Sequence, residues 1–140
     1  MSVRKNDQSP SRFNVLDQSL QLVGYTMQIL SNEKIFITKY QKLIDKISYE
    51  TSMIYHKCRV ANKTDMRVKD QVEYNLRAVT RLKLEREALQ LCEELQTDIM
   101  ISRKVFHLKA SKVRYWTKLT SETQNLIENW YKSEVKRYGI

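Results

Sequence analysis

Only two glycines and one proline occur in the 140 residues, and this scarcity is the feature that most restricts the fold. Sheets and tight turns rely on both residues for their special backbone angles, and average proteins use about 7% glycine and 5% proline. The sequence therefore favours long helices joined by short connections. A chain of this length can bury roughly 70% of its unfolded surface, so one domain is expected without a metal or a disulfide.

Apolar residues recur at spacings of three and four along four stretches of the chain, as in amphipathic helices. Ser9 and Pro10 form a helix-start signal, and Thr38 and Gln41 fit a capping box. We expect helices over about 10–30, 38–61, 65–99 and 109–137, with 100–108 as a connection. The predicted fold is all-α, an antiparallel up-down-up-down four-helix bundle, with residues 1–9 as a flexible basic arm and residues 10–138 as one domain.

The same spacings predict which positions face the core. For the first helix these are Phe13, Leu16, Leu20, Val23, Met27 and Leu30. For the second they are Tyr40, Leu43, Ile44, Ile47, Thr51, Ile54, Cys58 and Ala61. For the fourth they are Val113, Trp116, Leu119, Thr120, Thr123, Leu126, Ile127 and Trp130.

The third helix carries two apolar stripes that lie on different faces. The first is Val68, Val72, Leu76, Val79 and Leu82, and the second is Leu84, Ala88, Leu91, Leu95 and Ile99. One stripe is enough for a bundle core, so the second predicts an oligomer interface through Leu84, Leu91 and Leu95. The alternative is that this part of the helix is buried from more than one side.

The constellations that enzymes need do not occur in the sequence. His56 and His107 are isolated, the metal-ligand spacings of bundle sites do not occur, and there is no glycine-rich phosphate loop. Glu85, Glu87, Glu93 and Glu94 have the pattern of solvated helix faces. We therefore expect no catalytic residue, no metal and no cofactor, and keep a cryptic enzyme only as a third hypothesis.

The cellular setting is predicted from the cysteines and the apolar runs. Cys58 and Cys92 lie far apart among apolar residues, which is typical of ordinary core thiols in a reducing compartment. No apolar run reaches the roughly 18 residues of a membrane span, and the first residues lack a signal-peptide pattern. We expect a cytoplasmic protein with no membrane partner.

The net charge of +9 is concentrated toward the two ends of the chain. Residues 99–121 hold six basic residues and no acidic one, and a row of cations suits phosphate backbones. The candidate nucleic-acid-binding residues are Arg4, Lys5, Arg12, Arg103, Lys104, Lys109, Lys112, Arg114, Lys118 and Lys132. Tyr115 lies among them and can stack on a base. An acidic protein partner and an ordinary solvated face remain alternatives.

Several short motifs resemble a family of small bacterial four-helix-bundle proteins, the accessory variability determinants of diversity-generating retroelements. They are Met1-Ser2-Val3-x-Lys5, Phe13, Leu16, Tyr25-Thr26, Asn32-x-Lys34, Ala61-Asn62, Lys112-Val113-Arg114-Tyr115-Trp116-x-Lys118-Leu119 and Leu126-Ile127-x-x-Trp130-x-Lys132-Ser133. The resemblance covers most of the chain. A proline near the start of the second helix, expected for the family, does not occur.

The resemblance implies a bundle without catalysis of its own that assembles into a ring, a pentamer in the family's studied form. It also implies that the ring binds a reverse transcriptase and its template RNA. A related bundle family, encoded by inserts in large-subunit ribosomal RNA genes, shares the fold without a settled function. A helical adaptor for an acidic protein therefore stands as the alternative to the reverse-transcriptase accessory.

Overall fold

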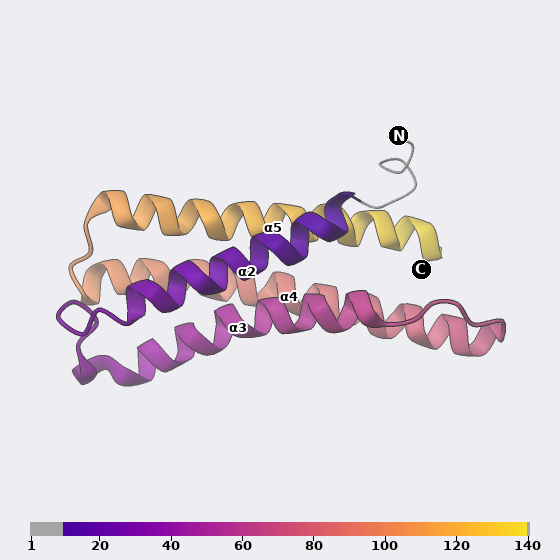
Figure 1. Ribbon diagram of the computed structural model, residues 1–140, viewed down its shortest axis with the longest axis horizontal. Helices are drawn as coiled ribbons and strands as arrows, with labels where there is room; N and C mark the ends of the chain where they lie inside the picture. The colour runs from indigo at the N-terminus through magenta and orange to yellow at the C-terminus, as the bar shows by residue number, and fades with distance from the viewer. Residues whose placement is uncertain (1–9, 140) are drawn as a thin grey trace.

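The computed structural model describes the backbone of residues 10–139 and the side chains of residues 14–139 (Figure 1). Its long helices are α2 (Pro10–Leu30), α3 (Gln41–Lys63), α4 (Gln71–Val105) and α5 (Ala110–Tyr138), and a 3-10 turn, η1 (Thr38–Tyr40), precedes α3. Each helix packs against its two neighbours around the bundle, in the order α2, α3, α4, α5 and back to α2. The predicted all-α four-helix bundle is confirmed, while the predicted arm at residues 1–9 lies outside the described residues.

The core faces of α3 and α5 are confirmed by the burial of their side chains. In α5 the predicted inner positions are buried, except that Leu126 is half-buried, and both tryptophans are almost fully enclosed. Trp116 donates its indole N–H to the hydroxyl oxygen of Thr26 at 3.0 Å. The largest apolar side chains are thereby buried without leaving the indole nitrogen unpaired, as a buried polar group requires.

The inner face of α2 differs from the predicted stripe. Val15, Leu22 and Ile29 are buried, whereas Leu20 is 51% exposed. Two polar residues, Ser19 and Thr26, lie on the buried face. Ser19 satisfies its hydroxyl by donating to the carbonyl oxygen of Val15 at 2.6 Å, and Thr26 accepts the bond from the α5 indole. The apolar count misplaced the face because locally bonded hydroxyl groups can be buried at little cost. The side chain of Phe13 lies outside the described residues.

Helix ends also differ from the sequence prediction. Helix α4 begins at Gln71, six residues later than expected, because Asp70 caps it by accepting from the backbone N–H of Glu73 at 2.9 Å. It continues to Val105, so most of the predicted connection is helical. The predicted capping box at Thr38 and Gln41 does not form, because the chain enters α3 through η1 and no side chain caps either element.

The second apolar stripe of α4 lies against the bundle core, while of the first stripe only Leu82 is buried and Val68 precedes the helix. Leu95 is fully buried, and Leu84 and Leu91 pack half-buried against the core. The predicted oligomer interface through these residues is wrong, because the bundle itself already covers them. Val72, Leu76 and Val79 are instead 67%, 59% and 49% exposed. Figure 1 shows the reason: the first turns of α4 project beyond the ends of the other helices.

A charged cluster is buried where α4 meets α5. Arg81 donates to Glu134 from Nε and from a terminal nitrogen at 2.7 and 2.6 Å, and Trp130 donates to the same carboxylate at 2.9 Å. Burial would raise the pKa of Glu134, but these bonds lower it overall. Glu85 is fully buried beside the pair rather than solvated as predicted, and neither of its oxygens has a hydrogen-bond partner. Burial, with the neighbouring carboxylate of Glu134, raises the pKa of Glu85 to about 10.

A second polar cluster joins α3 to α4. Lys46 donates to Glu50 and to Asp98, whose side chains are both almost fully buried. Burial raises the pKa of Glu50 to about 7. Lys46 is itself about half exposed, whereas Glu50 lies in the core although it is not among the predicted core positions of its helix. Ion pairs between residues far apart in the chain do not affect the local spacing of apolar residues. Neither cluster could therefore be predicted from the sequence of one helix at a time.

Replacing Glu85 with glutamine is expected to stabilise the bundle at high pH. The folded pKa of Glu85 lies above the usual value of about 4.3, so folding requires its protonation. The free energy of unfolding therefore falls as pH rises from about 5 towards 10. Glu85→Gln removes that loss, and thermal melting should show a gain of at least about 1 kcal/mol at pH 9 and little at pH 5. The exposed Glu93→Gln is the matched control, and a gain independent of pH would contradict the assignment.

Candidate nucleic-acid interface

The antiparallel order of the helices brings two distant segments to one end of the bundle. The α2–α3 connection and the α4–α5 connection lie together at the left of Figure 1, and the α3–α4 connection lies at the right. We call residues 28–46 and 99–118 the basic end. These two segments hold ten basic and two acidic residues, a net +8 of the chain's +9. Lys46 is paired with Glu50 and Asp98, which lie just outside the segments, and with these two carboxylates counted the excess is +6. Most of the excess positive charge therefore lies at one end of the bundle.

Six of the candidate nucleic-acid-binding residues belong to the basic end. Arg103 and Lys104 lie in the last turn of α4, Lys109 is the residue before α5, and the others lie in the first turns of α5. All are exposed except Lys112, which is half-buried. The full set is Arg103, Lys104, Lys109, Lys112, Arg114 and Lys118. Lys34, Lys39 and Lys42 join them from the other connection, and all three are exposed. The predicted antiparallel topology already places these three lysines at the same end of the bundle as the α4–α5 connection, so they could have been predicted from the sequence.

The remaining candidates do not reach the basic end. Lys132 lies near the other end of α5 and forms an ion pair with Glu128 at 3.2 Å. Arg12 belongs to the first turn of α2, also at the opposite end, and its side chain is outside the described residues. Arg4 and Lys5 lie outside the described residues altogether. The basic residues of α5 therefore lie at both ends of the helix, with Lys112, Arg114 and Lys118 at the basic end and Lys132, Lys136 and Arg137 at the other.

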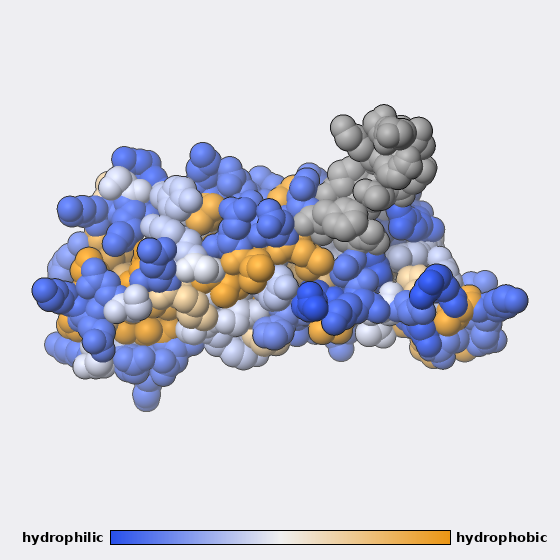
Figure 2. Space-filling model, viewed as in Figure 1, coloured by the Kyte–Doolittle hydropathy of each residue, from blue (hydrophilic) through white to orange (hydrophobic). Residues whose placement is uncertain are grey.

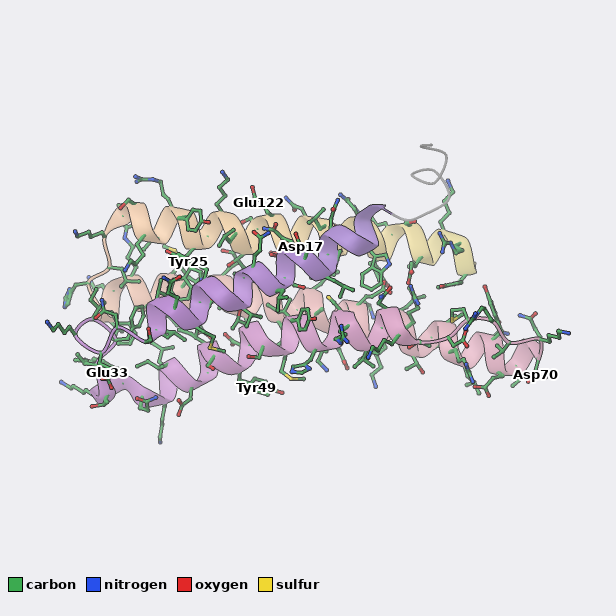
Figure 3. The ribbon with its side chains drawn as sticks, viewed as in Figure 1. Asp17, Tyr25, Glu33, Tyr49, Asp70 and Glu122 are labelled. Carbon is green, nitrogen blue, oxygen red and sulfur yellow. The ribbon has the colours of Figure 1, made fainter. Side chains whose placement is uncertain are left out.

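Two helices begin at the basic end without a capping side chain. Tyr40 precedes α3 and Lys109 precedes α5, and neither makes a side-chain cap bond; neither helix has an acidic residue in its first turn. At the opposite end Asp70 caps α4, and Glu73 lies in its first turn. Figure 3 labels Asp70 and Glu33 at these two ends. A helix N-terminus carries about half a positive charge, which the C-termini of α2 and α4 offset at the same end, so the positive field here comes from the lysine and arginine side chains.

Two adjoining pockets open at the basic end and share His107 and Leu108. One, of about 370 Å³, is also lined by Met100, Arg103 and Lys104. The other, of about 240 Å³, is also lined by Ile35, Lys109 and Lys112. Figure 2 shows hydrophobic residues among hydrophilic ones at this end of the molecule. Both pockets of the basic end are therefore lined by basic side chains and by apolar side chains, which we call the apolar floors.

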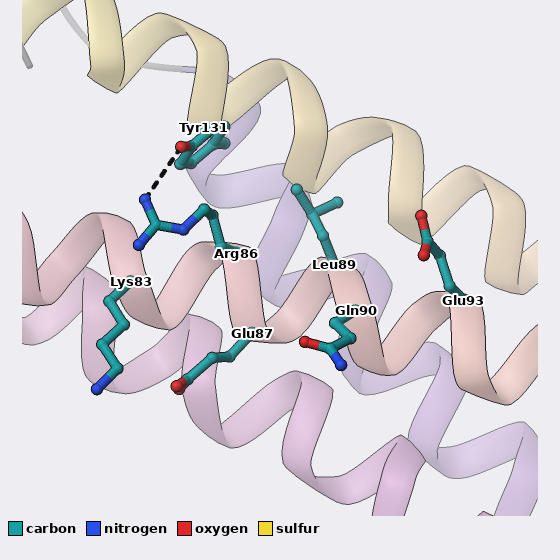
Figure 4. A pocket seen from close by; sticks show the side chains of 7 residues that line it. All are labelled: Lys83, Arg86, Glu87, Leu89, Gln90, Glu93 and Tyr131. Carbon is teal, nitrogen blue, oxygen red and sulfur yellow. Dashed lines mark hydrogen bonds between the residues drawn. The ribbon is translucent and has the colours of Figure 1, made fainter.

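A larger pocket than these two lies elsewhere, along the outer side of α4 beside α5 (Figure 4). Its volume is about 720 Å³, and its lining residues are Lys83, Arg86, Glu87, Leu89, Gln90, Glu93 and Tyr131. Arg86 donates to the hydroxyl of Tyr131 at 3.3 Å, and Lys57 pairs with Glu87 at 3.0 Å. Two basic and two acidic groups balance in this groove, so it has no net attraction for phosphate.

A third basic pocket, of about 450 Å³, lies at the opposite end of the bundle. Arg67 there pairs with Asp65 at 3.0 Å, and Arg81 is held by Glu134. Lys63 and Arg137 lie in the last turns of α3 and α5, where a cation offsets the negative end of a helix. Ion pairs with acidic side chains therefore match part of the positive charge at this end.

The described residues offer little for catalysis by metal or thiol. Residues 10–139 contain no group of three or more histidine, cysteine, aspartate or glutamate side chains placed to hold a metal ion. Burial raises the pKa of the Cys92 thiol to about 12 and that of the Cys58 thiol well above its usual range. Thiols held in this protonated form are poor nucleophiles. Among the described helices, none has the length and apolar content to cross a membrane.

No family model, curated protein or solved structure matches the chain.

Placing an aspartate at the start of α5 tests the electrostatics of the basic end. Lys109→Asp supplies a capping carboxylate, so we expect the free energy of unfolding to rise by about 1 kcal/mol and the affinity for RNA to fall. Lys136→Asp is the matched control, since Lys136 is exposed in the last turn of α5 and a negative charge there opposes the helix dipole. Denaturant unfolding measures both variants. A Lys109→Asp protein no more stable than the unmodified chain would contradict this account.

Proposed function

We propose that this chain is a non-catalytic accessory subunit that binds RNA, with the phosphate backbone held on its basic end. The observation that carries the proposal is the gathering of most of the excess positive charge at one end of the bundle. Each phosphate that such a surface neutralises releases condensed counterions and favours binding. Helix α5 begins at the same end without a capping side chain, and the N–H groups of a helix start favour a bound phosphate.

The partners we propose are the reverse transcriptase of a diversity-generating retroelement and its template RNA, in the bacterial cytoplasm. This part of the proposal is supported by the family resemblance of the sequence. The charge distribution is compatible with it, because residues 47–98 carry nine basic and nine acidic groups. A balanced surface of this kind suits contact with another protein, whereas the basic end suits RNA.

Charge reversal on α5 tests the RNA-binding part. Arg114 and Lys118 are exposed at the basic end, so the double variant Arg114→Glu/Lys118→Glu should weaken RNA binding at least about tenfold and lower the salt slope by about 2. Lys132→Glu/Lys136→Glu makes the same change on the same helix at the other end, and should have little effect. Filter binding of a structured RNA across a salt series measures both. Equal losses for the two pairs would show that the basic end is not the binding surface.

Self-association is proposed through the exposed apolar stripe at the start of α4, which consists of Val72, Leu76 and Val79. These side chains follow each other at helical spacing and are 67%, 59% and 49% exposed. A stripe of this kind can pack against a different surface of the next copy, in the head-to-tail contact that a closed ring requires. A pentamer is the number that the family resemblance implies.

A glutamate in this stripe tests the assembly. Leu76→Glu should lower the mass in solution to that of a monomer, because it buries a charge in the proposed contact. The control is Leu20→Glu, since Leu20 is also half exposed but lies alone on α2. Light scattering gives the masses. A chain that is already monomeric without substitution, or an oligomer that persists in the Leu76 variant, would rule out this interface.

A second candidate function is an adaptor for an acidic protein. Met100, Ile101 and Ile37 are 53%, 43% and 41% exposed at the basic end. An acidic amphipathic segment could bind such a mixed surface through both its charges and its apolar side chains. The two functions separate in a competition experiment, because binding to an acidic protein that ignores added RNA would favour the adaptor.

A further inference from the structure

We infer that the basic end binds unpaired nucleotides and holds a base in the pockets beside His107, rather than docking on the backbone of a duplex. The inference rests on the proposed RNA-binding function and specifies the kind of RNA that fits. It is carried by the shape and lining of the two adjoining pockets and by the conformation of the residue between them.

The pocket linings combine two kinds of surface that a single nucleotide needs. Leu108 contributes to both pockets, and Met100 and Ile35 add apolar surface on either side. Phosphates gain nothing from such apolar floors, whereas the faces of bases stack on apolar and aromatic side chains. The bases of a duplex are stacked inside the helix and cannot enter a pocket. The apolar floors therefore favour a strand whose bases are free.

Basic side chains border the two pockets on opposite sides. Arg103 and Lys104 line the larger pocket, and Lys109 and Lys112 line the smaller one. A nucleotide seated between them would have its preceding and following phosphates next to a pair of cations each. This arrangement of cations suits one strand that passes through the site. Proteins that bind single strands likewise hold the backbone in a positively charged groove.

His107 occupies a position where glycine is usual. Its φ is +55°, and it is the only described residue other than glycine with a positive φ. Leu108 donates its backbone N–H to the carbonyl oxygen of Arg103 at 3.2 Å, and Phe106 donates to that of Ser102 at 2.8 Å. The first of these is the long bond of a Schellman motif at the end of α4, in which the left-handed residue is most often glycine, and the second is an ordinary bond of the last helical turn. The chain instead places an exposed imidazole at the border of both pockets.

The imidazole at this position is an exposed stacking surface at the border of both pockets. Histidine and arginine planes are among those on which unpaired bases stack. The left-handed backbone of His107 sets where the side chain leaves the main chain, and the exposed ring can still rotate onto a bound base. Arg103, in the larger pocket, adds a guanidinium plane on the same side. We expect the base to lie between these groups and the apolar floor.

The test compares one labelled RNA strand with the same strand annealed to its complement. Fluorescence anisotropy with the full chain, at one fixed salt concentration, should give about tenfold tighter binding to the single strand. His107→Gly keeps the left-handed backbone and removes the ring, so the preference should fall to about twofold or less while duplex binding stays unchanged. His107→Asn, which also tolerates a positive φ, should behave like the glycine variant.

Each outcome separates this inference from the proposed function. If single strand and duplex bind equally, and both are weakened by Arg114→Glu/Lys118→Glu, the base-binding inference is overturned and RNA binding on the basic end stands. If the protein prefers the single strand, and both His107 variants keep this preference with an unchanged melting temperature, then the base does not bind beside His107. If neither RNA binds at low salt, the proposed function fails and this inference fails with it.

Discussion

The antiparallel packing of four long helices is the constraint on which the rest of the structure depends. Trp116, Trp130 and the apolar faces of α2, α3 and α4 fix the helices side by side, so the connections must alternate between the two ends of the bundle. The α2–α3 and α4–α5 connections consequently lie together. Charges that are some 60 residues apart in the chain become one surface, and the proposed function depends on that convergence.

Much of the fold could be predicted from the sequence, because two helices have unambiguous faces. Trp116, Leu119, Ile127 and Trp130 repeat at helical spacing, and the whole α5 face follows from them. Prediction failed where burial depended on a distant partner. Thr26 is buried because it bonds an indole of α5. Glu85 is buried beside an arginine–glutamate pair that spans α4 and α5, which no local pattern reveals.

The α4 stripes show a different limit. Both stripes have the spacing of a core face. Which of them is buried depends on how far the other helices extend alongside α4. The stripe at Leu84, Leu91 and Leu95 lies where all four helices overlap. The stripe at Val72, Leu76 and Val79 lies where α4 extends beyond its neighbours. In the candidate site, the run from Arg103 to Lys118 was found because it is continuous in sequence. Lys34 and Lys39 were missed because only the topology brings them there.

Lysine footprinting with and without RNA tests the central claim most directly. Acetylation of the free protein should modify exposed lysines at both ends, and bound RNA should protect those of the basic end only. The expected protected set is Lys34, Lys39, Lys42, Lys104, Lys109, Lys112 and Lys118. Lys69 and Lys83, which are exposed away from this end, should react as before. Protection spread evenly over the bundle, or confined to Lys69 and Lys83, would contradict a basic end that binds RNA.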